Sequence, residues 1–98
     1  MGKVKRRIEL APVHPGEVIQ HELNELKLTQ TEFANLIGVT QRTINELCKE
    51  KRSLSVDMAI RLSLSIGGLP DMWLSLQNGY DLAQVDKVRF SEIKKIAA

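Results

Sequence analysis

The twenty residues from Gln30 to Lys49, QTEFANLIGVTQRTINELCK, decide the fold that we expect for this chain. Thr29 precedes them and Glu32 lies three residues after it, which is the capping-box pattern of a helix start. Gly38 can adopt the left-handed conformation that ends such a helix, and Thr40 is placed to cap the next one. Two helices of about eight residues joined by Gly-Val-Thr cross at a steep angle, so this stretch predicts a helix-turn-helix.

The packing residues of this stretch support the same interpretation. Ala34 is small at the point where the two helices should touch. The residues that should fix the angle between the helices are all apolar: Phe33, Ile37, Val39, Ile44 and Leu47. Each is common alone, but in register with the turn glycine they favour a helix-turn-helix over a helical bundle that happens to contain such a turn.

The outer face of the second helix carries the candidate base-reading residues. At about 100° per residue from Ile44, Arg42 and Glu46 point away from the core, and the first turn of such a helix enters the major groove of DNA. Arginine can pair with guanine, asparagine or glutamine with adenine, and glutamate with the amino group of cytosine. We therefore expect base reading from Gln41, Arg42, Thr43, Asn45 and Glu46. The alternative is an ordinary solvated helix face, and phosphates repel Glu46 unless it finds that amino group.

Candidate phosphate contacts flank the same helix. Gln30 stands at the N-terminus of the preceding helix, where free backbone amides favour an anion, and Thr40 stands at the start of the second helix. Lys49, Lys51 and Arg52 follow the second helix as a short cationic cluster. Such a cluster is often only solvated surface, but its position here favours phosphate binding.

The sequence on either side predicts three further helices. One begins at His14-Pro15-Gly16-Glu17, with proline at the first helical position and an acid in the first turn. Ser55 caps another helix, whose apolar residues lie nearly all round, so we expect it to be central and mostly buried. The last helix begins at Pro70, and Asn78-Gly79 either breaks it or only weakens it.

The predicted fold is therefore all-α, with a compact five-helix domain over residues 14–85. A basic arm, residues 1–13, precedes it and a short tail, residues 86–98, follows it. In the tail, the apolar spacing fits either an alternating strand or a frayed helix: Val88, Phe90, Ile93 and Ile96.

The charge of the chain is small on average and uneven in its distribution. The 98 residues have an ordinary globular composition, 43% hydrophobic and 27% charged, which excludes a disordered or fibrous chain. The net charge of +2 does not by itself indicate a nucleic-acid-binding protein. Residues 1–14 hold four cations and one acid, residues 86–98 hold four and two, and residues 15–85 hold six and nine. Placement of the cations must therefore carry any function in DNA binding.

Several classes of protein and site are excluded by simple counts. Cys48 is the single cysteine, which excludes an intramolecular disulfide and a thiolate metal cluster and fits a reducing compartment. The two histidines are far apart and no acids stand at ligand spacing, so we expect no catalytic residue, no metal and no cofactor. No apolar run approaches the roughly 20 residues that span a bilayer. The expectation is a cytoplasmic protein that is neither an enzyme nor bound to a membrane.

Four stretches carry a resemblance to a known family: HPGEVI at residues 14–19, LTQTEFANLIGVTQRTINEL at 28–47, KRSLSVDMAIRLSLSIG at 51–67 and PDMWLSLQNGYDL at 70–82. In these stretches the chain resembles the HigA-type antitoxins, also called virulence-associated protein I, within the Cro/C1 repressor-like class. The last stretch discriminates them from generic repressors, which lack its pattern of Trp73, Leu74, Leu76, Gln77, Tyr80, Asp81 and Leu82.

This resemblance implies a Cro/C1-like domain that forms a homodimer and binds a palindromic operator in double-stranded DNA. It also implies autorepression of a two-gene operon and neutralisation of a RelE-like ribonuclease toxin. The alternative is a free-standing transcriptional repressor whose partners are DNA and a second copy of itself. The two functions differ in whether an adjacent gene encodes a small basic toxin.

The chain departs from the family pattern at two helix ends. Lys27 stands where a glycine often ends the first helix, and Lys49-Glu50 stands where the family commonly has Asn-Gly. A left-handed cap at Glu50 would cost roughly 1 kcal/mol, unless another type of turn replaces it.

The last predicted helix carries the candidate dimer interface. A single half-site offers few readable contacts, and two-fold operators with half-sites about 34 Å apart are the usual solution. The helix holds more apolar residues than a core of this size needs, and we expect the surplus at the interface: Trp73, Leu76, Tyr80 and Leu82. The alternative is that these residues only cover the preceding helix.

Overall fold

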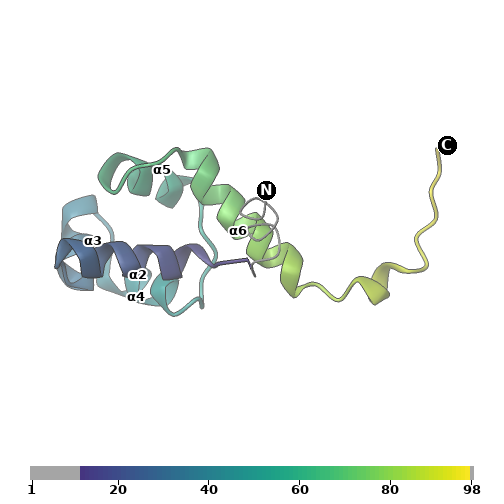
Figure 1. Ribbon diagram of the computed structural model, residues 1–98, viewed down its shortest axis with the longest axis horizontal. Helices are drawn as coiled ribbons and strands as arrows, with labels where there is room; N and C mark the ends of the chain where they lie inside the picture. Colours follow the sequence, from purple (N-terminus) through teal and green to yellow (C-terminus); the bar gives the residue numbers. More distant parts are fainter. Residues whose placement is uncertain (1–11, 98) are drawn as a thin grey trace, which may run out of the picture.

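Residues 12–97, which the computed structural model describes, form five α-helices and one 3-10 helix (Figure 1). In chain order these are α2 (Pro15–Leu26), α3 (Gln30–Ile37), α4 (Gln41–Cys48), α5 (Val56–Ser65), α6 (Pro70–Gln84) and η1 (Lys87–Phe90). The expected all-α fold is confirmed, and the tail forms a 3-10 turn instead of either predicted element. Residues 1–11 of the predicted basic arm lie outside the described residues.

The helices begin where a side chain can satisfy free backbone amides. The Thr29 hydroxyl accepts the amide of Glu32 at 3.0 Å, and the Glu32 carboxylate accepts the amide of Thr29 at 2.9 Å, which completes the predicted capping box. Ser55 caps α5 as expected. The cap of α2 was not predicted: Nδ1 of His14 accepts the amide of Gly16 at 2.9 Å.

Two helices end on residues other than glycine in the left-handed conformation. The φ angle is 58° at Lys27 after α2 and 61° at Glu50 after α4. In both turns the next amide reaches back to a carbonyl near the helix end, Leu28 to Leu23 at 3.0 Å and Lys51 to Glu46 at 2.8 Å. These bonds offset the roughly 1 kcal/mol that a left-handed side chain costs. The left-handed turn therefore persists at Glu50, and no other turn replaces it.

The hydrophobic core draws side chains from all five α-helices. Ala34 is almost fully buried, as its small size in the helix-turn-helix predicted. The buried apolar residues are Ile19, Leu23, Phe33, Ala34, Ile44, Leu47, Leu54, Met58, Ala59, Leu62 and Trp73. Aliphatic side chains dominate this list, as expected from a chain with 4% aromatic residues.

The prediction that α5 is mostly buried is wrong. Only Met58, Ala59 and Leu62 of α5 are buried, whereas Leu64 is 84% exposed and Ile60 is 44% exposed. Apolar residues around a helix show which faces could be buried, but a face is buried only where another element of the chain packs on it. α5 packs on α6 and lies at the edge of the helical domain (Figure 1), and on its open side Leu64 lines a hollow of about 320 Å³ beside Leu36.

α6 continues without a break through Asn78 and Gly79 to Gln84. The indole N–H of Trp73 donates to the Gly67 carbonyl at 2.9 Å, and its side chain is 1% exposed. Trp73 is therefore a core residue, which corrects the expectation that it lies in a dimer interface. The indole fills the space between α6 and the turn after α5.

α2 and α4 approach each other so closely that only glycine fits at the contact. A Cβ atom added to Gly16 would lie 1.7 Å from the carbonyl oxygen of Leu47. Real side-chain carbons are never so close to a backbone atom, so α2 would have to move away from the end of α4. The absence of a side chain at Gly16 thus helps to set the position of α4.

We predict opposite effects for alanine at two glycines of this chain. Gly16→Ala should destabilise the fold by on the order of 3 kcal/mol, because the new methyl group collides with backbone. Gly79→Ala should stabilise it by roughly 0.5–1 kcal/mol, because Gly79 lies inside α6 and an added Cβ meets nothing within 4 Å. Urea unfolding followed by circular dichroism measures both. A wild-type midpoint for Gly16→Ala would contradict the close contact.

Candidate nucleic-acid interface

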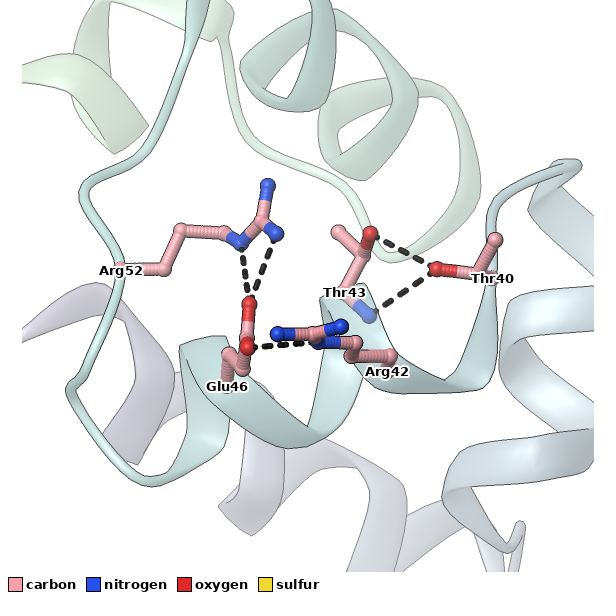
Figure 2. Close-up of polar contacts among 5 residues, drawn as sticks. All are labelled: Thr40, Arg42, Thr43, Glu46 and Arg52. Atoms are coloured by element: carbon pink, nitrogen blue, oxygen red, sulfur yellow. Dashed lines mark hydrogen bonds and ion pairs between the residues drawn. The ribbon is translucent and has the colours of Figure 1, made fainter.

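α4 lies on the domain with one face in the core and the opposite face in solvent. Ile44 and Leu47 are fully buried, and Gln41 and Arg42 in the first turn are exposed. The Thr40 hydroxyl accepts the amide of Thr43 at 3.1 Å, and the two hydroxyl oxygens are 2.9 Å apart (Figure 2). The Thr40 cap predicted from the sequence is therefore present.

Asn45 does not simply project into solvent. Its side-chain amide donates to Oε1 of Gln30 at 3.1 Å, which links α4 to the start of α3. The amide of Gln30 donates in turn to Oε1 of Gln20 at 2.9 Å, and that of Gln20 to Oδ1 of Asn24 at 2.9 Å. Sequence reasoning missed the contribution of α2 to this chain of amides. The spacing of Gln20 and Asn24, four residues apart on one helix, was the available signal.

Glu46 stands between two arginines. Its Oε2 accepts from Nε of Arg42 at 2.9 Å, and its Oε1 accepts from Nη2 and Nε of Arg52 at 2.7 and 3.0 Å (Figure 2). The hydrogen bond from Arg42, followed by those from Arg52, lowers the pKa of the Glu46 carboxyl. The same bond to Glu46 raises the pKa of Arg42. The structure thus brings two predicted base-reading residues and one predicted phosphate-binding residue into a single cluster.

The remaining predicted phosphate contacts lie around α4. Lys49 and Lys51 are exposed in the turn that follows the helix, and Thr40 is exposed at its start. Gln30 is half-buried, because its side chain is shared between Gln20 and Asn45. These residues therefore lie around α4, but their side chains are not equally available to a phosphate. The two lysines are open to solvent, whereas Gln30 is hydrogen-bonded to its neighbours.

The comparisons with known proteins agree with this geometry. The helix-turn-helix family matches residues 19–74. The chain is 40% identical over 83 residues to YddM of Escherichia coli K12, an uncharacterized HTH-type transcriptional regulator, with 84% of this chain and 88% of YddM covered. It is 34% identical over 83 residues to antitoxin HigA-1 of Vibrio cholerae serotype O1, with 84% and 74% covered. The chain belongs to the HigA-type family of helix-turn-helix proteins.

The HigA-type fold extends to solved structures. The structure of Pseudomonas aeruginosa antitoxin HigA with the higBA promoter superposes with a TM-score of 0.78 and 32% sequence identity, covering 88% of this chain and 99% of that one. HigA-type proteins are a DNA-binding family, not an enzyme family.

Within residues 12–97, no three His, Cys, Asp or Glu side chains group as they would to hold a metal ion. No helix within residues 12–97 is both long enough and apolar enough to cross a membrane.

Cys48, at the end of α4 in this HigA-type domain, is half-buried against the core. Burial raises the pKa of its thiol to about 11. The thiolate is the reactive form, so the native thiol should react slowly at neutral pH. This fits the prediction that Cys48 is a small packing residue.

We predict that iodoacetamide alkylates Cys48 in the folded protein at least about tenfold more slowly than in urea at pH 8. A raised pKa leaves less thiolate at any pH below it, so the folded-state rate should keep rising with pH towards about 11. Mass spectrometry of timed aliquots measures both rates. Equal rates in folded and unfolded protein at pH 8 would contradict the raised pKa.

Proposed function

We propose that this chain is the sequence-specific DNA-binding antitoxin of a toxin–antitoxin module. As a dimer it binds a palindromic operator and represses its own operon, and it neutralises a RelE-like ribonuclease toxin. The observation that carries the proposal is α4, a capped helix with a buried inner face and a polar outer face. A relative that was solved with its promoter shares this fold at 32% identity.

In this proposal the outer face of α4 reads bases. Gln41 and Arg42 occupy the first turn, where a recognition helix meets base edges in the major groove. Thr43, Asn45 and Glu46 lie behind them on the same helix and complete the reading face. The hydrogen bond that the Asn45 side-chain amide donates to Gln30 supports a fixed orientation of this face relative to α3.

Phosphate binding falls to groups around the helix. Lys49, Lys51 and Arg52 follow α4 directly, and Thr40 and Gln30 stand at the starts of α4 and α3. Phosphate contacts fix the register of a protein on the duplex without reading its sequence.

The end of α6 supports dimerisation. Leu82 is 66% exposed, and the apolar side chains that follow it are also exposed: Val85, Val88, Phe90 and Ile93. A second copy that covered them would remove apolar surface from water. Leu76 and Tyr80 of the same helix are half-buried and remain candidate contacts.

One comparison favours a second function, that of a free-standing repressor. YddM, the relative at 40% identity, is described as a transcriptional regulator and not as an antitoxin. The same α4 surface would serve this function, and the partners would be DNA and a second copy only.

Co-expression with the neighbouring small gene separates the two functions. We predict that induction of the neighbour alone stops growth and that co-expression of this chain restores growth and allows copurification of the two proteins. A neighbour that is harmless alone and does not copurify would instead favour the free-standing repressor.

We predict that two cations of this surface affect DNA binding differently. Arg42→Ala should cost about 1–3 kcal/mol on the cognate operator and relax the preference at one base position. Lys51→Ala should weaken operator and scrambled duplex alike and reduce the salt slope by about one. Fluorescence anisotropy titrations over a range of salt concentrations measure both. A base-selective loss with Lys51→Ala would place that lysine in a groove.

A further inference from the structure

We propose that Glu46 determines specificity by holding Arg42 and Arg52 away from DNA phosphates until the helix meets a matching base pair. The inference rests on the proposed function, since it concerns how the α4 surface distinguishes DNA sequences. It assigns Glu46 a role in the free protein and on non-cognate DNA as well as on the operator.

The geometry places one acid in control of two cations from different segments. Arg42 comes from the first turn of α4 and Arg52 from the loop after it, and both side chains converge on Glu46 (Figure 2). Each carboxylate oxygen serves one arginine, Oε2 for Arg42 and Oε1 for Arg52. The three side chains together carry a charge of +1 where the two arginines alone would carry +2.

The two arginines are held to different degrees. Arg52 donates from Nε and Nη2 to the same oxygen, whereas Arg42 donates from Nε alone and its side chain is 84% exposed. The side chain of Glu46 is 26% exposed, so it forms the less mobile centre of the cluster. Arg42 is therefore the first to be released when a better acceptor approaches.

This arrangement converts charge into sequence discrimination. Binding to any DNA gains from each cation that neutralises a phosphate and releases counterions. An arginine paired with Glu46 must give up that pair first, which weakens binding to every sequence. At a guanine, O6 and N7 accept both N–H groups of an arginine and replace the lost pair, and a neighbouring cytosine amino group can donate to the freed Glu46. The loss is thus compensated only at a matching site.

Glu46→Gln tests this inference, with Asp57→Asn as the matched control. Both substitutions remove one negative charge and one carboxylate that pairs with an arginine, since Asp57 binds Nε of Arg61 at 2.6 Å on α5. Glutamine keeps the length of the Glu46 side chain on the surface of α4, so the circular dichroism of the variant should match the wild type. The probes are a duplex from directly upstream of the chain's own gene and a scrambled duplex of equal length.

We expect Glu46→Gln to bind the scrambled duplex roughly threefold to tenfold more tightly and to steepen its salt slope by roughly one to two, one for each released arginine. The preference for the upstream duplex should fall by a similar factor. Asp57→Asn should change neither quantity by more than about twofold, because neither Asp57 nor its partner Arg61 belongs to the proposed base-reading or phosphate-binding residues. Equal effects of the two substitutions on the scrambled duplex would overturn the inference.

A double-mutant cycle separates arginine release from simple repulsion between Glu46 and phosphates. In the Arg42→Gln/Arg52→Gln background, Glu46→Gln should change affinity for the scrambled duplex less than about twofold. If the full increase persists there, Glu46 acts directly on phosphates and the inference fails.

The proposed function has its own readout. A wild-type protein that shows no preference for the upstream duplex counts against that function, whereas the Glu46 comparison uses only the scrambled duplex.

Discussion

The position of α4 depends on the burial of Ile44 and Leu47, because an eight-residue helix cannot sustain itself in water. Isolated helices shorter than roughly 12–15 residues are marginal even for favourable sequences. α4 gains its stability from these two anchors, from the Thr40 cap and from the close approach that Gly16 permits. The same contacts that keep the helix folded also fix its direction, so its polar face is presented in one orientation.

Three of the α6 residues that carry the resemblance to HigA-type antitoxins make contacts within the fold. Trp73 closes the turn after α5, and the side-chain carbonyl of the buried Gln77 accepts the amide of Leu54 at 2.8 Å. Tyr80 meets the ring of His14 edge-on, with centroids 4.8 Å apart. Because His14 caps α2, this contact ties the last helix to the first described one. Trp73, Gln77 and Tyr80 thus hold α6 against the rest of the domain. The exposed apolar surface suited to a partner begins near Leu82.

Sequence reasoning succeeded where a local rule determines the outcome. The capping box at Thr29, the turn at Gly38 and the inner residues of α4 each follow from spacing along the chain. Sequence reasoning failed where the outcome depends on which other part of the chain packs against a residue. The exposure of Leu64 could not be read from periodicity, because the pattern does not say how many neighbours α5 has. The pairing of Glu46 with Arg52 required the path of the loop after α4, which no helical wheel contains.

The small net charge of the chain takes on meaning at this surface. Attraction to DNA in general scales with unpaired cations, and two of the cations next to α4 are already bound to Glu46. This pairing reduces what the domain gains from phosphates, so more of its affinity has to come from contacts that form only in register with bases. One short helix offers few such contacts, and joining two domains on one operator multiplies their effect. The reduced attraction to DNA phosphates and the proposed dimerisation therefore have the same effect. Both make binding depend on contacts with specific bases, and both limit binding to DNA of other sequences.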